Sequence, residues 1–263
     1  MRRALERLRR ELTALDAEAA RDRAADPQPD RAPLIVTLVA GLCLVFMEYT
    51  RERPLLRALY AAMPALQVPR FAALAELATW VLVRIIGFFV LPALAVRLLL
   101  HERLRDHGLA VAGLGPHLRT YLGVFALVLP CIVVASLQPA FTAYYPFYRF
   151  AGASWLDLGV WELLYGLQFV ALEFFFRGFW LTGCRRSFGT HAVLVSAVPY
   201  CMIHFTKPVL EVIAALPAGI VLGLLALRAR SIWGGALVHV AVAWTMDLLA
   251  LLRTTGLPTR LLP

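Results

Sequence analysis

The amino-acid sequence predicts an all-α fold, a polytopic membrane helix bundle of about seven transmembrane helices plus interfacial helices. Of its 263 residues, 60% are hydrophobic and 16% are charged, whereas a soluble domain is about 45–50% apolar and about 25% charged. The apolar residues are concentrated in runs close to the ~20 residues that a helix needs to cross ~30 Å of hydrocarbon. The composition therefore argues against a soluble enzyme or a disordered chain and predicts an integral membrane protein.

Residues 1–32 are predicted to form a charged, cytoplasmic N-terminal segment. It lacks the apolar core of a signal peptide. Leu5, Leu8, Leu12 and Leu15 recur with helical spacing among Arg and Glu residues. We expect an amphipathic helix that either lies on an anionic leaflet or extends into solvent, and a group of prolines ends it.

Seven apolar runs follow, three of them in an N-terminal part, 33–137, and four in a C-terminal part, 138–263. Each run is predicted to be one membrane helix. Between them, the stretches 51–71 and 101–118 are interrupted by Pro or Gly and contain several Arg residues, so they are predicted to be interfacial. The runs cover residues 34–49, 72–99, 120–137, 158–183, 190–206, 209–227 and 231–252.

The net charge of +9 does not indicate a nucleic-acid partner, because Arg lies mainly between the apolar runs and in the N-terminal segment. Lys and Arg are roughly twice as frequent in the segments that face the cytoplasm if the N-terminus is inside. We therefore expect a protein of the bacterial inner membrane, in contact with the lipid bilayer, with a cytoplasmic N-terminus. The four cysteines form no CxxC pair and indicate neither a zinc knuckle nor a disulfide framework.

Ionisable side chains inside the apolar runs carry the functional signal, since each costs about 2.5–3.5 kcal/mol in the middle of a bilayer. The fourth run holds Glu173 and Arg177, the fifth His204, and the last His239 and Asp247. At 1.5 Å per residue, the glutamate and the two histidines are expected at similar depths. The aspartate is expected about 12 Å beyond the last histidine, too far to bond the same small group without water.

These residue types can perform hydrolysis. A carboxylate beside an imidazole can take a proton from water, and a second imidazole can stabilise the developing oxyanion. Arg177 stands four residues after Glu173 and can pair with it. The residues alone leave alternatives open: an ion pair that only fixes helix packing, a His₂Glu zinc site, or a transporter, although the internal repeat that transporters often show is not visible.

The fourth run also carries a motif. Residues Leu172 to Phe179, LEFFFRGF, resemble the first motif, EExxxR, of the CPBP (CAAX protease and bacteriocin-processing) intramembrane endopeptidases. Tyr200 and His204 resemble the second motif, FxxxH, with Tyr in place of Phe, and His239 resembles the first position of the third, HxxxN or HxxxD. The resemblance covers roughly residues 155–252, in the family's order.

The resemblance implies a bundle of membrane helices that hydrolyses a peptide bond with glutamate-activated water, without a cofactor; a divalent metal stays open. It implies three catalytic residues and three supporting ones. They are Glu173, His204 and His239, supported by Arg177, Tyr200 and Asp247.

Two positions depart from the family pattern. Leu172 stands where the first glutamate of the motif is expected, and Ala243 stands where a polar residue should follow His239, with Asp247 one turn later. Either Glu173 has taken over the activation of water, helped by a π-bulge or a shifted helix, or the protein is a non-catalytic scaffold or chaperone of the same fold.

Two stretches also resemble a bacterial branch of the family that includes the myxosortases, proposed to process C-terminal sorting signals. They are EFFFRG, from Glu173, and HFTKP, from His204. The resemblance implies a substrate that is a membrane-anchored protein or one that bears a C-terminal signal. The predicted orientation opens the site towards the outer face, where such an anchor could be cut.

Overall fold

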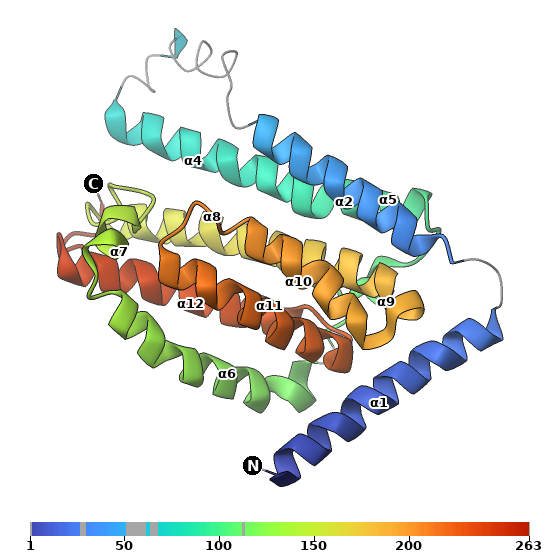
Figure 1. The fold of residues 1–263 in the computed structure, drawn as a ribbon. Helices are drawn as coiled ribbons and strands as arrows, with labels where there is room; N and C mark the ends of the chain where they lie inside the picture. Colours follow the sequence, from blue (N-terminus) through green and yellow to red (C-terminus); the bar gives the residue numbers. More distant parts are fainter. Residues whose placement is uncertain (1, 27–29, 51–61, 64–67, 112–113, 263) are drawn as a thin grey trace. The chain divides into compact units, whose positions relative to one another are not determined.

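The computed structural model describes residues 2–26, 30–50, 62–63, 68–111 and 114–262. All regular secondary structure in these ranges is helical, as predicted (Figure 1). The elements are α1 (Arg2–Ala25), α2 (Ala32–Tyr49), α4 (Pro69–Ile85), the π-helix η2 (Ile86–Val90), α5 (Leu91–Leu98), the 3₁₀ helix η3 (Leu104–His107), α6 (Leu114–Ala135), α7 (Pro139–Tyr144), α8 (Trp155–Glu173), the π-helix η4 (Phe174–Leu181), α9 (Thr182–Phe188), the 3₁₀ helix η5 (Gly189–His191), α10 (Ala192–Met202), α11 (Val209–Ala229) and α12 (Trp233–Arg253).

Six helical stretches of the described chain are long and apolar enough to cross a membrane. The predicted count of about seven is not confirmed, because the runs 158–183 and 190–206 fall within one stretch. Residues 51–61 and 64–67 of the predicted interfacial segment lie outside the described residues. The six stretches are Ala32–Tyr49, Pro69–Leu98, Leu114–Ala135, Trp155–Met202, Val209–Ala229 and Trp233–Arg253.

The stretch Trp155–Met202 is folded back on itself. Helices α8, η4 and α9 continue one another to Phe188, and Gly189 then takes a φ of 56°, a left-handed value that suits glycine. After this reversal, α10 packs against η4. Since α10 has 11 residues, it is only about 16 Å long, about half the thickness of the hydrocarbon core.

The chain divides into two units, each built from three stretches of sequence. The first unit contains Met1–Leu42, Leu91–His117 and Glu173–Gly235. In it, α10 packs along α11, and a Cβ at Gly219 would lie 3.0 Å from the ring of Tyr200. Glycine therefore allows the two helices to approach closely, as small residues do in membrane proteins.

Helix α1 belongs to this first unit and packs against α9 and η5. Ala19 of α1 is buried. Acidic side chains of α1 contact η5 and α9: Asp16 accepts a hydrogen bond of 2.8 Å from the amide of Thr190. Arg185 lies 3.5 Å from Glu18. Residues Arg2–Ala25 thus form one helix, and carboxylates along it contact α9 and η5. That this helix also lies on a leaflet or extends into solvent stays a prediction.

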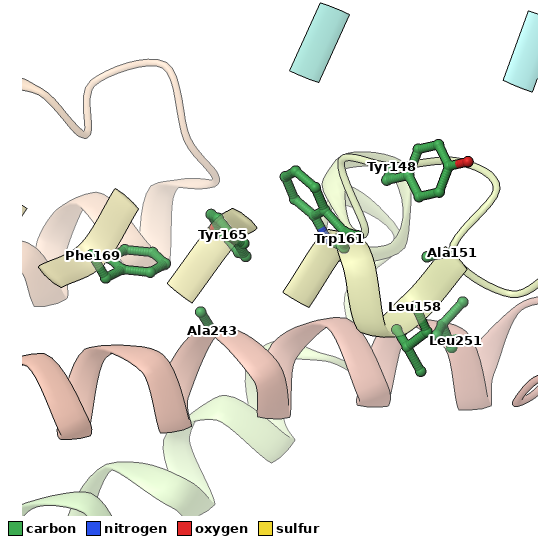
Figure 2. Packing of buried hydrophobic residues seen from close by; sticks show 8 residues of the cluster. All are labelled: Tyr148, Ala151, Leu158, Trp161, Tyr165, Phe169, Ala243 and Leu251. Carbon is green, nitrogen blue, oxygen red and sulfur yellow. The ribbon is translucent and has the colours of Figure 1, made fainter. Parts of the chain in front are cut away.

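The second unit contains Cys43–Val90, Leu118–Leu172 and Ala236–Pro263. Its main core lies between α8 and α12. Trp161, Tyr165 and Phe169 follow one another every fourth residue along α8, and Ala243 of α12 lies beside them (Figure 2). The rings of Trp161 and Tyr165 stack with centroids 4.8 Å apart, a geometry that favours aromatic packing.

A buried carboxylate fixes the start of α8. The Oγ of Ser154 accepts a hydrogen bond of 3.1 Å from the amide of Asp157 and donates one of 2.5 Å to its Oδ2, the arrangement of an N-terminal cap. Arg70 and Tyr148 donate to Oδ1 at 2.7 and 3.0 Å. Burial and the neighbouring carboxylate raise the pKa of Tyr148 to about 12.

Candidate active site

Glu173 and Arg177 form a buried ion pair at the junction of α8 and η4. The side chains of Glu173 and Arg177 are 0% and 1% exposed, and Arg177 Nη1 lies 3.2 Å from Glu173 Oε1. The pair expected from the i, i+4 spacing is therefore present. The first motif places a carboxylate and a compensating cation together in the protein interior.

The residues after Glu173 form a π-helix, in which the backbone bonds run from i to i+5. Two consecutive carbonyls in it accept hydrogen bonds from side chains. Thr182 Oγ1 donates to the oxygen of Arg177 at 3.0 Å, and Nδ1 of His107 donates to the oxygen of Gly178 at 2.9 Å. The helix thus changes its phase directly after Glu173; that this compensates for Leu172 stays a prediction.

Tyr200 connects this ion pair to His204. The guanidinium of Arg177 lies 4.3 Å from the centroid of the Tyr200 ring, on which the imidazole of His204 also packs, at 4.7 Å. Nδ1 of His204 lies 2.8 Å from the carbonyl of Tyr200 and donates to it. This bond fixes the tautomer, so that a neutral imidazole carries its lone pair on Nε2.

His204 was expected inside a helix spanning 190–206, but it lies in the turn after α10. Its amide donates to the carbonyl of Cys201 at 3.0 Å, a bond of the i→i−3 type. Pro208, four residues later, precedes α11. The chain reverses here, and the imidazole remains buried because it folds back on Tyr200.

Gly235, near the start of α12, closes the site on one side. A Cβ at this position would overlap Oε2 of Glu173 and lie 3.0 Å from its Cδ. Any larger residue here would therefore require the Glu173 carboxylate to shift. The sequence contains no signal for this role beyond the adjacent Gly234.

His239 and Asp247 belong to the second unit, whereas Glu173, Arg177, Tyr200 and His204 belong to the first. The ring of His239 stacks on Phe169 with centroids 5.3 Å apart and an interplanar angle of 11°. Asp247 is fully buried and accepts a hydrogen bond of 2.7 Å from the indole of Trp161. Asp247, which lies two turns after His239 on α12, therefore orients the indole of Trp161 on α8.

The two departures from the motif pattern are both apolar core residues. Leu172 is 4% exposed and Ala243 is 3% exposed. Ala243 packs in the aromatic cluster of the second unit (Figure 2). Neither position offers a polar atom to a substrate.

Sequence reasoning missed the side chains of His107 and Glu102, which lie in a stretch that was predicted only to be interfacial. Nε2 of His107 lies 2.5 Å from Oε2 of Glu102. Neither residue stands in an apolar run, so hydropathy does not mark them. Among the described residues, no group of three or more His, Cys, Asp or Glu side chains could hold a metal ion.

The comparison with protein families identifies the segment that carries these residues. No curated protein and no solved structure matches the chain. Residues 154–245 match a family described as type II CAAX prenyl endopeptidase Rce1-like. Over this segment, which contains the residues of all three motifs, the chain matches the Rce1-like CAAX endopeptidases of the CPBP family, a family of membrane-embedded proteases.

Proposed function

We propose that this protein is an intramembrane endopeptidase that hydrolyses a peptide bond of a membrane-anchored or C-terminal-signal-bearing protein. One observation carries the proposal: the fully buried carboxylate of Glu173 is paired with Arg177 and linked through the Tyr200 ring to His204. A charge buried at this depth is costly. Its position in a segment that matches a protease family supports a role in chemistry.

In the proposed reaction, Glu173 takes a proton from a water molecule, and the hydroxide attacks the carbonyl carbon of the scissile bond. The carbonyl becomes an oxyanion, which accepts a hydrogen bond from the imidazole of His239, while Nε2 of His204 accepts one from the attacking water. When the C–N bond breaks, Glu173 returns the proton to the leaving amine. Arg177 and Tyr200 hold the carboxylate and His204, and Asp247 supports the far end of α12.

Glu173 takes the role that the missing first glutamate would have. Leu172 cannot accept a proton, and it is buried among apolar side chains. The π-helix that follows Glu173 changes the angular relation between this residue and the rest of the motif. Since π-helical turns are frequent at functional sites, this supports the use of the second glutamate.

The test is cleavage by the purified full chain in lipid nanodiscs. One probe is a reporter protein with a single C-terminal transmembrane anchor, and the second is a farnesylated peptide ending in a CAAX sequence. The products are identified by mass spectrometry. The variants are Glu173→Gln, His204→Ala and His239→Ala, with Glu76→Gln and His191→Ala as controls, because those two side chains are exposed.

Loss of a general base or of an oxyanion donor costs on the order of 100-fold or more in rate, so the three variants should lose cleavage while the controls retain it. Cleavage of the anchored reporter and not of the CAAX peptide would support the myxosortase-like substrate. If Glu173→Gln and His204→Ala cleave as well as the parent, the proposed chemistry is wrong. If no version cleaves any probe, the alternative of a non-catalytic scaffold gains support.

The proposed orientation has the N-terminus in the cytoplasm and the site open to the outer face. It rests on the excess of Lys and Arg in the segments that would then face the cytoplasm. Reporter fusions in the 185–190 loop test it. A loop accessible from outside would refute the orientation without bearing on the chemistry.

A further inference from the structure

The loop between α5 and α6 carries a pair of side chains for which the proposed reaction has no role. His107 is fully buried, although it lies outside the membrane-spanning stretches. Its Nδ1 lies 2.9 Å from the carbonyl oxygen of Gly178, and its Nε2 lies 2.5 Å from Oε2 of Glu102, whose side chain is 51% exposed. One imidazole thus joins a surface carboxylate to the interior of the π-helix.

The hydrogen atoms of this pair follow from its partners. A carbonyl oxygen only accepts, so Nδ1 of His107 carries a proton. Nε2 and a carboxylate oxygen at 2.5 Å need a second proton between them. The hydrogen bond from His107 lowers the pKa of Glu102, helped by the charges of Arg185 and Arg186. Nε2 of His107 and Oε2 of Glu102 therefore share one proton, and Nδ1 keeps another for the carbonyl of Gly178.

The loop fits closely on η4. A Cβ at Gly178 would lie 2.6 Å from the carbonyl oxygen of His107 and 2.8 Å from the ring of Phe174. The next residue of the loop, Gly108, has a φ of 83° and accepts a hydrogen bond of 2.9 Å from the amide of Ile232. The loop therefore passes against the backbone of η4 with no side chain between them.

The same loop also contacts the beginning of α12. The indole of Trp233 donates a hydrogen bond of 3.1 Å to the carbonyl of Leu109. Gly235, two residues later, leaves the space that the Glu173 carboxylate fills. The loop thus touches both elements that enclose the carboxylate, η4 on one side and the start of α12 on the other.

We propose that His107 is a positioning residue for Glu173, and that Glu102 holds the imidazole of His107 in its orientation. This inference rests on the proposed function. His107 bonds the π-helical turn one residue after Arg177 and thereby sets the angle at which Arg177 meets Glu173. It does not contact the substrate in this role.

The test uses the full chain in nanodiscs and two measurements. The first is hydrogen–deuterium exchange of the amides of residues 174–181, which needs no activity. The second is kcat and KM with the anchored reporter. The variants are His107→Leu, which removes both bonds, and His107→Asn, whose amide can still donate to Gly178. The control is His101→Asn, on an exposed histidine of the same loop that has a positive φ tolerated by Asn.

We expect faster exchange and an unchanged KM in His107→Leu. Its kcat should fall by on the order of 10- to 100-fold, since a misplacement of about 1 Å can have this effect. His107→Asn should recover most of kcat, and His101→Asn should match the parent. Faster exchange with an unchanged kcat would overturn the positioning role of His107. Unchanged exchange would show that the hydrogen bond from His107 does not stabilise the π-helix, and would overturn the proposal at that earlier step.

If His107→Leu does not fold, Glu102→Gln replaces it as the test variant. The uncharged amide at this half-exposed position should lower kcat mildly, by about 2- to 5-fold. A kcat of Glu102→Gln equal to that of the parent would refute the proposal that Glu102 orients the imidazole of His107. If the parent itself cleaves nothing, the proposed function fails, while the exchange measurement still decides whether His107 holds the π-helix.

Discussion

The buried ion pair of Glu173 and Arg177 makes the sharpest prediction, because it can be tested without a substrate. The attraction between charges 3.2 Å apart is about 5 kcal/mol at an effective dielectric constant of about 20. Desolvation offsets much of this for the pair, but loss of one partner leaves the other charge buried. Arg177→Met should therefore reduce the free energy of unfolding by about 3–5 kcal/mol.

The assay is a double-mutant cycle, read as thermal unfolding of the purified protein in detergent. Arg177→Met and Glu173→Gln should each lower Tm by about 6–20 °C, since 1 kcal/mol corresponds to about 2–4 °C for a chain of this size. The double variant buries no unpaired charge, so it should lose at least about 3 kcal/mol less than the sum of the single losses.

The matched control is the exposed pair of Arg7 and Glu11, which has the same residue types at the same spacing and lies 3.3 Å apart. Arg7→Met should change the free energy of unfolding by less than about 1 kcal/mol. Single losses that add up in the double variant would refute the reasoning, because the two side chains would then not stabilise each other.

Three further predictions concern other parts of the structure. Gly235→Ala should lower kcat on the order of 100-fold by displacing the Glu173 carboxylate, whereas Gly159→Ala, which meets nothing within 4 Å, should leave cleavage unchanged. Ser154→Ala removes the cap of α8 and should cost about 1 kcal/mol in thermal unfolding; a Tm equal to that of the parent would contradict this. The pKa of Glu102 is lowered in the folded protein by its imidazole partner, so its contribution to stability is present above the ordinary value and lost as the pH falls through the lower one. Unfolding measured against pH should therefore show a weaker acid dependence in Glu102→Gln, and an identical profile would exclude the pair.

Several features followed from local patterns. The described helices α2, α11 and α12 begin and end within about two residues of the predicted runs, because the length of an apolar run limits a membrane helix. Helix α6 begins at Leu114, six residues before the predicted run 120–137 and within the segment 101–118 that was predicted to be interfacial. The i, i+4 spacing of Glu173 and Arg177 is likewise local, so their pairing could be predicted.

Other features depended on contacts that no local pattern contains. The reversal at Gly189 turned one predicted crossing into the short helix α10. The gap between the predicted runs 158–183 and 190–206 marked this reversal, but hydropathy could not reveal that α10 would have only 11 residues. A second reversal, after α10, placed His204 in a turn against the ring of Tyr200.

The sequence by itself determined that the chain is an all-helical membrane protein, and it identified the few ionisable residues within the apolar runs. Only the tertiary structure decided which residues contact them. His107 lies 71 positions from Gly178 along the chain, and the space at Gly235 is filled by a carboxylate from another helix. The energy of a buried charge or of a π-helical turn depends on neighbours that the folded chain brings from distant positions. The excess of apolar residues required a membrane, whereas the fit of a loop and a glycine around Glu173 required the fold.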